Sequence, residues 1–453
     1  MRAQSLYQGF ADGFDFKDLH GRDEAIGTQL ARMSAFCYSH VSLWKDMFDA
    51  LRIKPEKIQS LEDLRLLPFS NKKTLLERPV QDRLGLPETS CVRMSTSGTT
   101  GGPMPVFYSK DFYSYIAALY NFRVRRTQGA PYFGSSVMIN YDARANDRQY
   151  MSGKPPSKRR GRGLGILATL FGPVHDRMTK RLYIGSGAED IMDDLSRLNP
   201  RRVLGSPAYF RLVADAVNSG KCRGIRPRTI LCFGEPFDEP TRDYLAGTFG
   251  CDVYDGYGTN ETGPVAIECR YKSGLHIIQD SLVVEVLNDG KPARPGEEGD
   301  VYVTSLKNRG MPLFRYDVGD RAVMGDSACR CGRRTQKLES VEGRSTDFVT
   351  SSDGHRVSPR KIGTIMHSVQ GLPRCQLVEL REFEYRLRVF GQSSDPVDEL
   401  VLALRKELGD VDMEVSLENP EALRAKFRLV VSMRSPSLDN GRTQPFLDKV
   451  VAS

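Results

Sequence analysis

Between residues 91 and 262, apolar segments typical of strands alternate with segments of helical periodicity, and this alternation restricts the fold more than any other feature. Residues 136–140 and 228–233 have the composition of buried strands, whereas residues 209–219 repeat apolar side chains at helical spacing. Such alternation predicts a parallel sheet with crossover helices, an α/β core. Sheets of this kind bind ligands at the carboxyl ends of their strands. The strand at 228–233 runs directly into Gly234-Glu235-Pro236, a turn at such an end.

Two smaller regions are expected around this core, because 453 residues suit about two or three domains. Residues 1–90 have a mostly helical pattern and are expected to form an N-terminal lid region. The core is expected to span 91–343, and its part from 276 to 325 changes to short alternating strands separated by Asp-Gly and Pro-Gly turns, the signature of a β-subdomain. Residues 344–453 have the pattern of a small α+β domain.

Residues 95–103, Ser-Thr-Ser-Gly-Thr-Thr-Gly-Gly-Pro, form a loop that is suited to binding a polyphosphate. Glycine lets the backbone approach phosphate oxygens, and hydroxyl groups with backbone N–H groups supply hydrogen-bond donors. The loop lacks the lysine of a Walker A element, so a kinase-type P-loop is excluded. Taken alone, the stretch also fits a Ser/Gly-rich surface turn.

Three later motifs join this loop in a fixed order: Tyr254–Gly263, Leu313–Asp320 and Gly343–Asp347. Together the four resemble the core motifs of the adenylate-forming superfamily. Three further stretches resemble, more narrowly, its phenylacetate–CoA ligase branch with the CapK-like proteins: residues 58–64 with Leu67-Pro68 and Lys72-Lys73, then Gly274-Leu275-His276, and Cys329–Arg333. The resemblance covers roughly residues 40–430 and is weakest in the last hundred residues. It implies a large N-terminal adenylation body, with parallel sheets, helices and a small β-subdomain, and a small mobile α+β C-terminal domain.

The resemblance also implies a nucleotide site, in which each motif has one task. The triphosphate would be held by Ser95, Thr96, Ser97, Gly98, Thr99, Thr100 and Gly101. The adenine would lie among Gly234, Glu235, Pro236, Asp255, Tyr257 and Gly258. Glu261 would hold the Mg²⁺ that bridges the phosphates, Asp320 would accept the ribose hydroxyls, and Arg344 would add a charged donor. Asp317 competes for the ribose role, with a turn cap as its structural alternative. Asp320 is favoured because Val318-Gly319-Asp320 keeps the Gly-Asp pairing of the family.

A lysine of the C-terminal domain completes adenylation in the superfamily, and the resemblance gives this catalytic role to Lys426, beside Glu261 and Thr96. The chain has Ala425 where the family usually has glycine. A solvated lysine on a strand is the alternative for Lys426. Asp347 corresponds to the hinge about which the small domain rotates.

Three cysteines and one histidine have a spacing that could hold a metal: Cys269-x₆-His276 and, after 52 further residues, Cys329-x-Cys331. Three thiolates and an imidazole suit tetrahedral Zn²⁺ with no open position, which is a structural site. Some members of the branch carry a zinc with such ligands. Unliganded cysteines in a reduced cytosol are the alternative.

Composition restricts the partners and the compartment. The net charge of +8 comes from 65 basic and 57 acidic residues, and it is spread widely except at residues 154–162, which we interpret as a solvated loop. We therefore expect no nucleic-acid partner. No apolar run approaches the ~18 residues of a membrane helix, and no signal-peptide pattern begins the chain. The nine cysteines, an odd number, predict reduced thiols and not a disulfide framework. We also expect a cytoplasmic protein that is a monomer or a homodimer.

The expected function is ATP-dependent activation of a carboxylic acid, with an aryl or arylacetic acid as the class that the branch implies. The acid would form an acyl adenylate with release of pyrophosphate, and the acyl group would pass to CoA. A ligase that passes it to an amine or a hydroxyl is the runner-up. A catalytically silent nucleotide-binding module is a third hypothesis, and Glu261 and Asp320 together argue against it. Tyr141, Ser206, Pro207 and Tyr209 are candidate positions for the acid pocket by their place between motifs.

Overall fold

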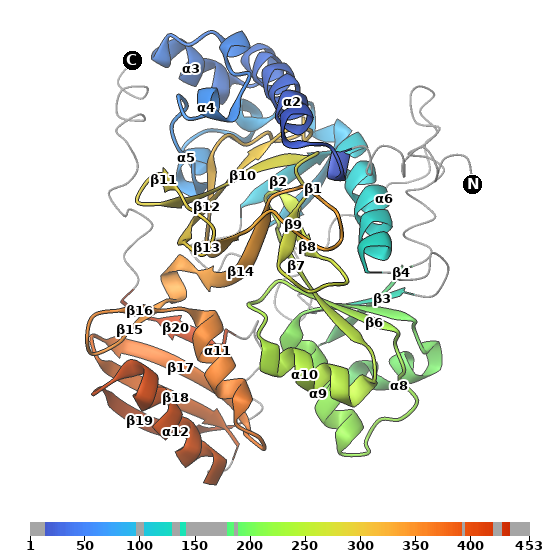
Figure 1. Cartoon of the computed structure of the whole chain (residues 1–453), viewed down its shortest axis with the longest axis vertical. Helices are drawn as coiled ribbons and strands as arrows, with labels where there is room; N and C mark the ends of the chain where they lie inside the picture. Colours follow the sequence, from blue (N-terminus) through green and yellow to red (C-terminus); the bar gives the residue numbers. More distant parts are fainter. Residues whose placement is uncertain are drawn as a thin grey trace.

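A single sheet of twelve strands organises the part of the chain that the structure describes (Figure 1). The computed structural model describes residues 14–96, 104–128, 136–141, 179–184, 189–391, 395–419 and 428–434. One half of the sheet is parallel, in the order β4-β3-β5-β6-β7. Its strands are β3 (Ser136–Tyr141), β4 (Thr179–Ile184), β5 (Arg202–Gly205), β6 (Thr229–Phe233) and β7 (Asp252–Thr259). The predicted parallel core is confirmed.

The other half of the sheet is antiparallel and begins where β7 turns back into β8. Its strands are β8 (Gly263–Glu268), β9 (Leu275–Ile277), β10 (Leu282–Asn288), β11 (Lys291–Pro292), β12 (Glu298–Ser305), β13 (Tyr316–Gly325) and β14 (Lys337–Arg344). This half contains the β-subdomain expected over 276–325. A separate hairpin, β1 (Cys91–Ser95) with β2 (Pro105–Ser109), flanks residues 97–103.

Helices of the body pack on the parallel half through apolar faces, as the alternating sequence requires. The helices are α6 (Lys110–Thr127), α8 (Glu189–Leu198), α9 (Pro207–Asn218) and α10 (Glu239–Phe249). A hydrophobic cluster joins β3, β5 and β6 to α8, α9 and α10 through residues such as Leu195, Phe210 and Leu245. Asp238 caps α10 by accepting the Thr241 N–H at 2.8 Å, a stabilising contact at a helix N-terminus.

The N-terminal region is helical, and its apolar side chains belong to the same core as β8–β14. Its longer helices, α2 (Leu19–His40) and α3 (Ser42–Leu51), lie at the end of the molecule away from the C-terminal domain (Figure 1). Shorter segments follow: η1 (Pro55–Lys57), α4 (Leu61–Leu64), α5 (Lys72–Leu76), η2 (Val80–Arg83) and η3 (Glu88–Ser90). The helical region expected to be a lid therefore shares one hydrophobic core with the body over residues 14–84.

The C-terminal domain has its own sheet, in the order β19-β18-β17-β20, and its own hydrophobic core. After η5 (Ser345–Asp347) it contains β15 (Val349–Thr350), β16 (Arg356–Val357), α11 (Pro359–Ser368), β17 (Arg374–Arg381), β18 (Glu384–Phe390), α12 (Asp395–Leu408), β19 (Asp412–Glu418) and β20 (Val430–Ser432). The expected α+β pattern is present. Among the described residues we find no helix with the length and apolarity needed to cross a bilayer.

Arg315 connects the N-terminal region to the antiparallel half of the sheet. Its side chain is almost fully buried and forms two hydrogen bonds to the Glu285 carboxylate, at 2.9 and 3.0 Å. It also donates to the Leu67 carbonyl at 2.9 Å and lies over the Phe69 ring at 4.1 Å. Because the guanidinium satisfies partners on both sides, its loss leaves a buried carboxylate unpaired.

We therefore expect Arg315→Ala to lower the free energy of unfolding by about 3–5 kcal/mol, the range for breaking a buried ion pair. Trp44, the only tryptophan, reports on this junction because its indole packs edge-on against Phe314 at 5.3 Å. Urea unfolding followed by Trp44 fluorescence measures the loss. Arg294→Ala is the matched control, because its pair with Glu297 is exposed and should contribute less than about 1 kcal/mol. Similar midpoints for the two variants would contradict the role of Arg315.

Candidate functional site

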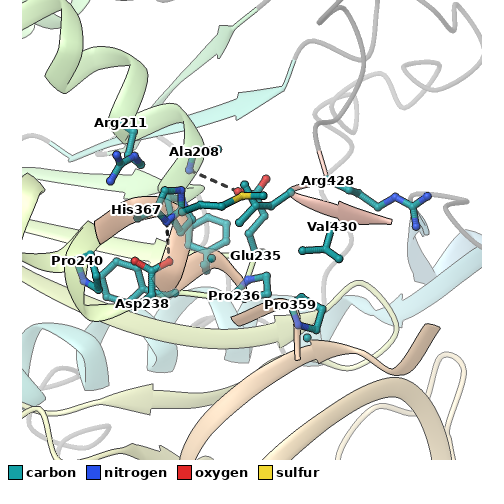
Figure 2. Close-up of a pocket in the computed structure, with 18 of the residues that line it drawn as sticks. Ala208, Arg211, Glu235, Pro236, Asp238, Pro240, Pro359, His367, Arg428 and Val430 are labelled. Atoms are coloured by element: carbon teal, nitrogen blue, oxygen red, sulfur yellow. Dashed lines mark hydrogen bonds and ion pairs between the residues drawn. The ribbon is translucent and has the colours of Figure 1, made fainter. Parts of the chain in front are cut away.

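A cavity of about 1350 Å³ lies between the body and the C-terminal domain. The body and the C-terminal domain both contribute to its wall, and Figure 2 shows Asp238 of the body facing His367 of the C-terminal domain. The predicted site residues that line it are Thr96, Gly234, Glu235, Pro236, Asp255, Tyr257, Gly258, Glu261, Asp320 and Arg344. Ser97, Gly98, Thr99, Thr100, Gly101 and Lys426 lie outside the described residues. Motifs that are far apart in the sequence thus meet at one cavity.

The turn Gly234–Pro236 forms one wall where β6 ends. Gly234 has φ +87°, a conformation that glycine adopts without strain. Glu235 accepts the backbone N–H of Ala208 at 3.4 Å, at the first turn of α9 (Figure 2). A carboxylate near a helix N-terminus is stabilised by the unpaired N–H groups there. The turn is therefore fixed to α9.

Asp255 lies on β7, next to a buried acid. Burial, reinforced by the charge of Glu268, raises the pKa of Asp255 to about 7. Glu268 accepts the Asp255 backbone N–H at 2.9 Å and pairs with Arg242 at 2.9 Å. Asp255 is thus close to half ionised at neutral pH, and only its ionised form offers two acceptor oxygens.

Tyr257, Asp320 and Arg344 form one hydrogen-bonded group. The Tyr257 hydroxyl donates to one oxygen of Asp320 at 2.7 Å, and Arg344 Nε contacts the other oxygen at 3.1 Å. Both oxygens of Asp320 keep a free lone pair, so the carboxylate can accept a pair of hydroxyls. Asp317 instead accepts the N–H of Gly319, two residues further along β13, at 2.8 Å, and it is not among the residues of the cavity wall. Between the two aspartates, this geometry favours Asp320 for the ribose role.

Glu261 lies at the tip of the β7–β8 hairpin, and the tip is held against β1. Asn260 donates from its side chain to the Ser95 carbonyl at 3.1 Å, and its own carbonyl accepts the Tyr108 hydroxyl at 2.6 Å. Ser95 itself is not in the cavity wall, whereas Thr96 is. Thr96 is joined to Met104, because its hydroxyl accepts the Met104 N–H at 2.9 Å. The hairpin tip that carries Glu261 is thereby held at the end of β1, next to Thr96.

Lys72 of α5, to which sequence reasoning gave no role, is not in the cavity wall but is charged close to it. Burial lowers the pKa of its ammonium, while Glu261 acts to raise it and Arg344 to lower it. Lys72 is therefore an electrostatic neighbour of both groups. For Glu261, burial raises the pKa and Arg344 acts against that rise. The signal in the sequence was the Lys72-Lys73 pair, which carried the narrower resemblance but had no role assigned.

Cys269, His276, Cys329 and Cys331 come together, with their ligand atoms all within 4.8 Å of one another. Cys269 follows β8, His276 is on β9, and the other two lie between β13 and β14. They meet because His276 pairs with Ile267 of β8 on one side and with Lys337 of β14 on the other. A cysteine-rich set with an imidazole fits a soft, tetrahedral ion such as Zn²⁺.

The surroundings of this cluster orient its ligands. His276 Nδ1 is 3.1 Å from the Thr335 hydroxyl, so Nε2 points to Cys331, 3.3 Å away. A partner on the second ring nitrogen is usual for a metal-ligating histidine. A hydrogen bond with Cys269 lowers the pKa of the Cys331 thiol, which favours a thiolate.

The C-terminal domain meets the body around its linker. Gly343, at φ +116°, lies between Pro359 and Pro236, where a Cβ would come within 3.0 and 3.2 Å of the two rings. Arg428 pairs with Asp347 at 2.9 Å. The segment 428–430 thus reaches the cavity wall beside the predicted hinge.

Comparison with known proteins agrees with this geometry. The family model for AMP-binding enzymes matches residues 45–308. Phenylacetate–CoA ligase of Thermus thermophilus is 26% identical over 366 residues, which cover 78% of this chain and 77% of that protein. The Escherichia coli phenylacetate–CoA ligase is 25% identical over 72% of each chain. The structure of a 2-hydroxyisobutyryl-CoA ligase in its postadenylation state has the same fold, with a TM-score of 0.75 and 20% identity over 97% of this chain and 94% of that one.

The chain therefore belongs to the AMP-binding enzyme family, the adenylate-forming superfamily, in its phenylacetate–CoA ligase-like branch.

If the Asp255 carboxylate accepts the amino group of adenine, AMP should bind more weakly below the pKa of about 7, because the protonated acid offers that amino group one acceptor fewer. We expect the affinity to fall up to tenfold per pH unit below 7. Calorimetric titration of AMP from pH 5.5 to 8.5 measures it. The AMP affinity of Asp255→Asn should not show this dependence on pH. The titration of the AMP phosphate is common to both proteins, so it cancels in the ratio of the parent affinity to the variant affinity. Parallel profiles would exclude the contact.

Proposed function

We propose that this protein is an AMP-forming acid–CoA ligase whose acid is aryl or arylacetic. In the first step a carboxylate attacks the α-phosphorus of ATP, which gives an acyl adenylate and pyrophosphate. In the second step the CoA thiol attacks the acyl carbon, which gives a thioester and releases AMP. The observation that carries the proposal is that one cavity joins Asp255, Glu261, Asp320 and Arg344 to the C-terminal domain. The phenylacetate–CoA ligase relatives support the class of acid.

The proposed roles follow from charge. The first step brings a carboxylate to a polyphosphate, so the site must hold two anions together and stabilise the charge that develops between them. Arg344 and Lys72 supply positive charge beside Glu261. Asp320, oriented by Tyr257 and Arg344, would accept the ribose hydroxyls. The chain's own groups would therefore fix the nucleotide at both ends.

Two metals belong to the proposal. Glu261 would hold Mg²⁺, which when bound neutralises charge on the phosphates. Cys269, His276, Cys329 and Cys331 would hold a structural Zn²⁺, and the support is their donor chemistry and their mutual distances within 4.8 Å. No open position is needed there, because four protein ligands complete a tetrahedron.

We keep Lys426 as the lysine that contacts the carboxylate and the α-phosphate. Its support is indirect. Arg428, two residues further on, pairs with Asp347, and the segment 428–430 lines the cavity. A segment that ends there can bring a long cationic side chain to the reacting groups.

The test of the function is pyrophosphate release over a panel of aryl, arylacetic and aliphatic acids, followed by mass spectrometry of the product with CoA, amines or alcohols as acceptors. We expect release with aromatic acids and a CoA thioester as the product. Glu261→Gln should keep the fold and most of the affinity for AMP, and lower pyrophosphate release by about 10²–10³. Glu339→Gln, at an exposed position outside the cavity wall, is the matched control and should match the parent. Amide or ester products would show that the acceptor is an amine or an alcohol and not CoA. If no acid leads to pyrophosphate release, the proposed function is refuted.

If the cysteine cluster holds zinc, the purified protein should contain about one zinc ion per chain by plasma mass spectrometry. Cys331→Ser should lose most of it and unfold at a lower temperature, because binding free energy of a structural metal is folding free energy. Cys251→Ser, a cysteine outside the cluster, should change neither quantity. A metal-free parent that is as stable as the zinc-loaded protein would remove the site.

A further inference from the structure

Helix α11 of the C-terminal domain presents one face to the segment that directly follows the adenine turn. Arg360 donates to the Phe237 carbonyl at 3.1 Å, and His367 Nδ1 is 2.7 Å from Asp238 Oδ2. The two residues are seven apart and so lie on the same side of the helix, two turns from each other. Gly363, between them, has no side chain that would block this approach, since a Cβ there would be 3.2 Å from Asp238 Oδ2.

Asp238 has a separate partner for each carboxylate oxygen. Oδ1 accepts the Thr241 N–H that caps α10, and Oδ2 faces His367, which Figure 2 shows across the cavity wall. Asp238 is 3% exposed, whereas the His367 side chain is 21% exposed. Burial acts to raise the pKa of Asp238, but the hydrogen bonds and charge of its partners, His367 first, outweigh it and the pKa is lowered. The acid is thus held ionised by a residue of the other domain.

The charged groups around the pair come from three helices. On α9, Arg211 donates to the Thr241 hydroxyl at 3.4 Å, and that hydroxyl is 3.0 Å from His367 Nδ1. On α10, Arg242 is directed away, to Glu239 and Glu268. On α11, Arg360 is directed to Phe237 and, at 3.7 Å, to Glu342. Leu429, before β20, adds an apolar contact at Gly363.

We propose that His367 is a positioning residue for adenylation, which fixes α11, and with it the C-terminal domain, against the wall of the adenine pocket through Asp238. The proposal rests on the proposed function. The imidazole and the carboxylate contact each other directly, at 2.7 Å, so the pair fixes α11 against the segment that follows the turn. Another ion pair between the domains, Arg360 with Glu342 at 3.7 Å, does not involve His367. A loss of docking in variants of His367 or Asp238 therefore tests this one contact.

His367→Gln and Asp238→Asn separate this role from the cap of α10. Glutamine can still donate to Asp238 but cannot carry charge, and asparagine keeps an oxygen for the Thr241 N–H. The matched control is His355→Gln, because His355 also faces an aspartate, Asp353 at 3.7 Å, but is 83% exposed. The substrate is the best acid of the panel, with CoA omitted, so that pyrophosphate release reports adenylation alone.

We expect both variants to lower adenylation about tenfold, mostly through a higher KM for ATP, the loss that a hydrogen bond between charged groups predicts. The double variant should lose no more than either single variant, since both remove the same contact. His355→Gln should match the parent.

Hydrogen exchange gives a readout that does not need turnover. Peptides that cover residues 237–241 and 359–368 should exchange faster in His367→Gln than in the parent, whereas His355→Gln should exchange like the parent. Adenylation or exchange in His367→Gln equal to that of the parent would overturn the proposal. If the parent releases no pyrophosphate with any acid, the proposed function fails, and the exchange data still decide whether His367 holds the domain.

Discussion

The pairing of β13 with β14 is the contact on which the rest of the site depends. Asp320 and Arg344 are direct partners in this antiparallel ladder, and their side chains form an ion pair at 3.1 Å. The same ladder ends at η5 and the linker, so the Asp320–Arg344 pair and the start of the C-terminal domain are set by one pair of strands. Pairs directly opposite on one face of a sheet are close enough to interact without help from loops. This pair of strands therefore joins the cavity wall to the C-terminal domain.

The strands and the motifs could be predicted from the sequence, because both are local properties. Alternation of apolar strands with helices indicated the parallel half, and Asp-Gly and Pro-Gly turns indicated the β-subdomain. The convergence of Asp255, Glu261, Asp320 and Arg344 followed from resemblance, since spacing alone does not bring a residue of β7 next to one of β13. Residues 97–103 and Lys426, which carry much of the predicted chemistry, lie outside the described residues.

Partners across long sequence distances could not be predicted. Lys72 lies within electrostatic range of Glu261 and Arg344 because Ser70 pairs with the start of β13, where it bonds to the backbone of Arg315 and Asp317. An amphipathic helix indicates that one face is buried, but not against which element, so the N-terminal region was expected to be separate from the core. His367 and Asp238 had no motif at all. Contacts between domains depend on the docked orientation, which a single sequence does not encode locally.

Buried charges link the cysteine cluster to the N-terminal region. Arg123 of α6 pairs with Asp15 at 3.0 Å and with Asp280 at 2.8 Å, and Arg333, beside Cys331, pairs with Asp15 at 3.1 Å. Buried pairs of this kind add little net stability, but each partner becomes costly if the other is missing. They favour the arrangement in which all three segments are present together.

The position of β9 has a consequence for the order in which the molecule folds. This strand pairs with β8, its near neighbour in sequence, and also with β14, about sixty residues away. Closing so long a loop costs entropy before the contact repays it. The hairpins of β10 to β13 shorten the effective distance, so they are expected to form first and β14 to arrive last. A chain released from the ribosome before β14 emerges would thus have all four residues of the cysteine cluster but neither Arg344 nor the C-terminal domain, so the cavity between the domains would be incomplete.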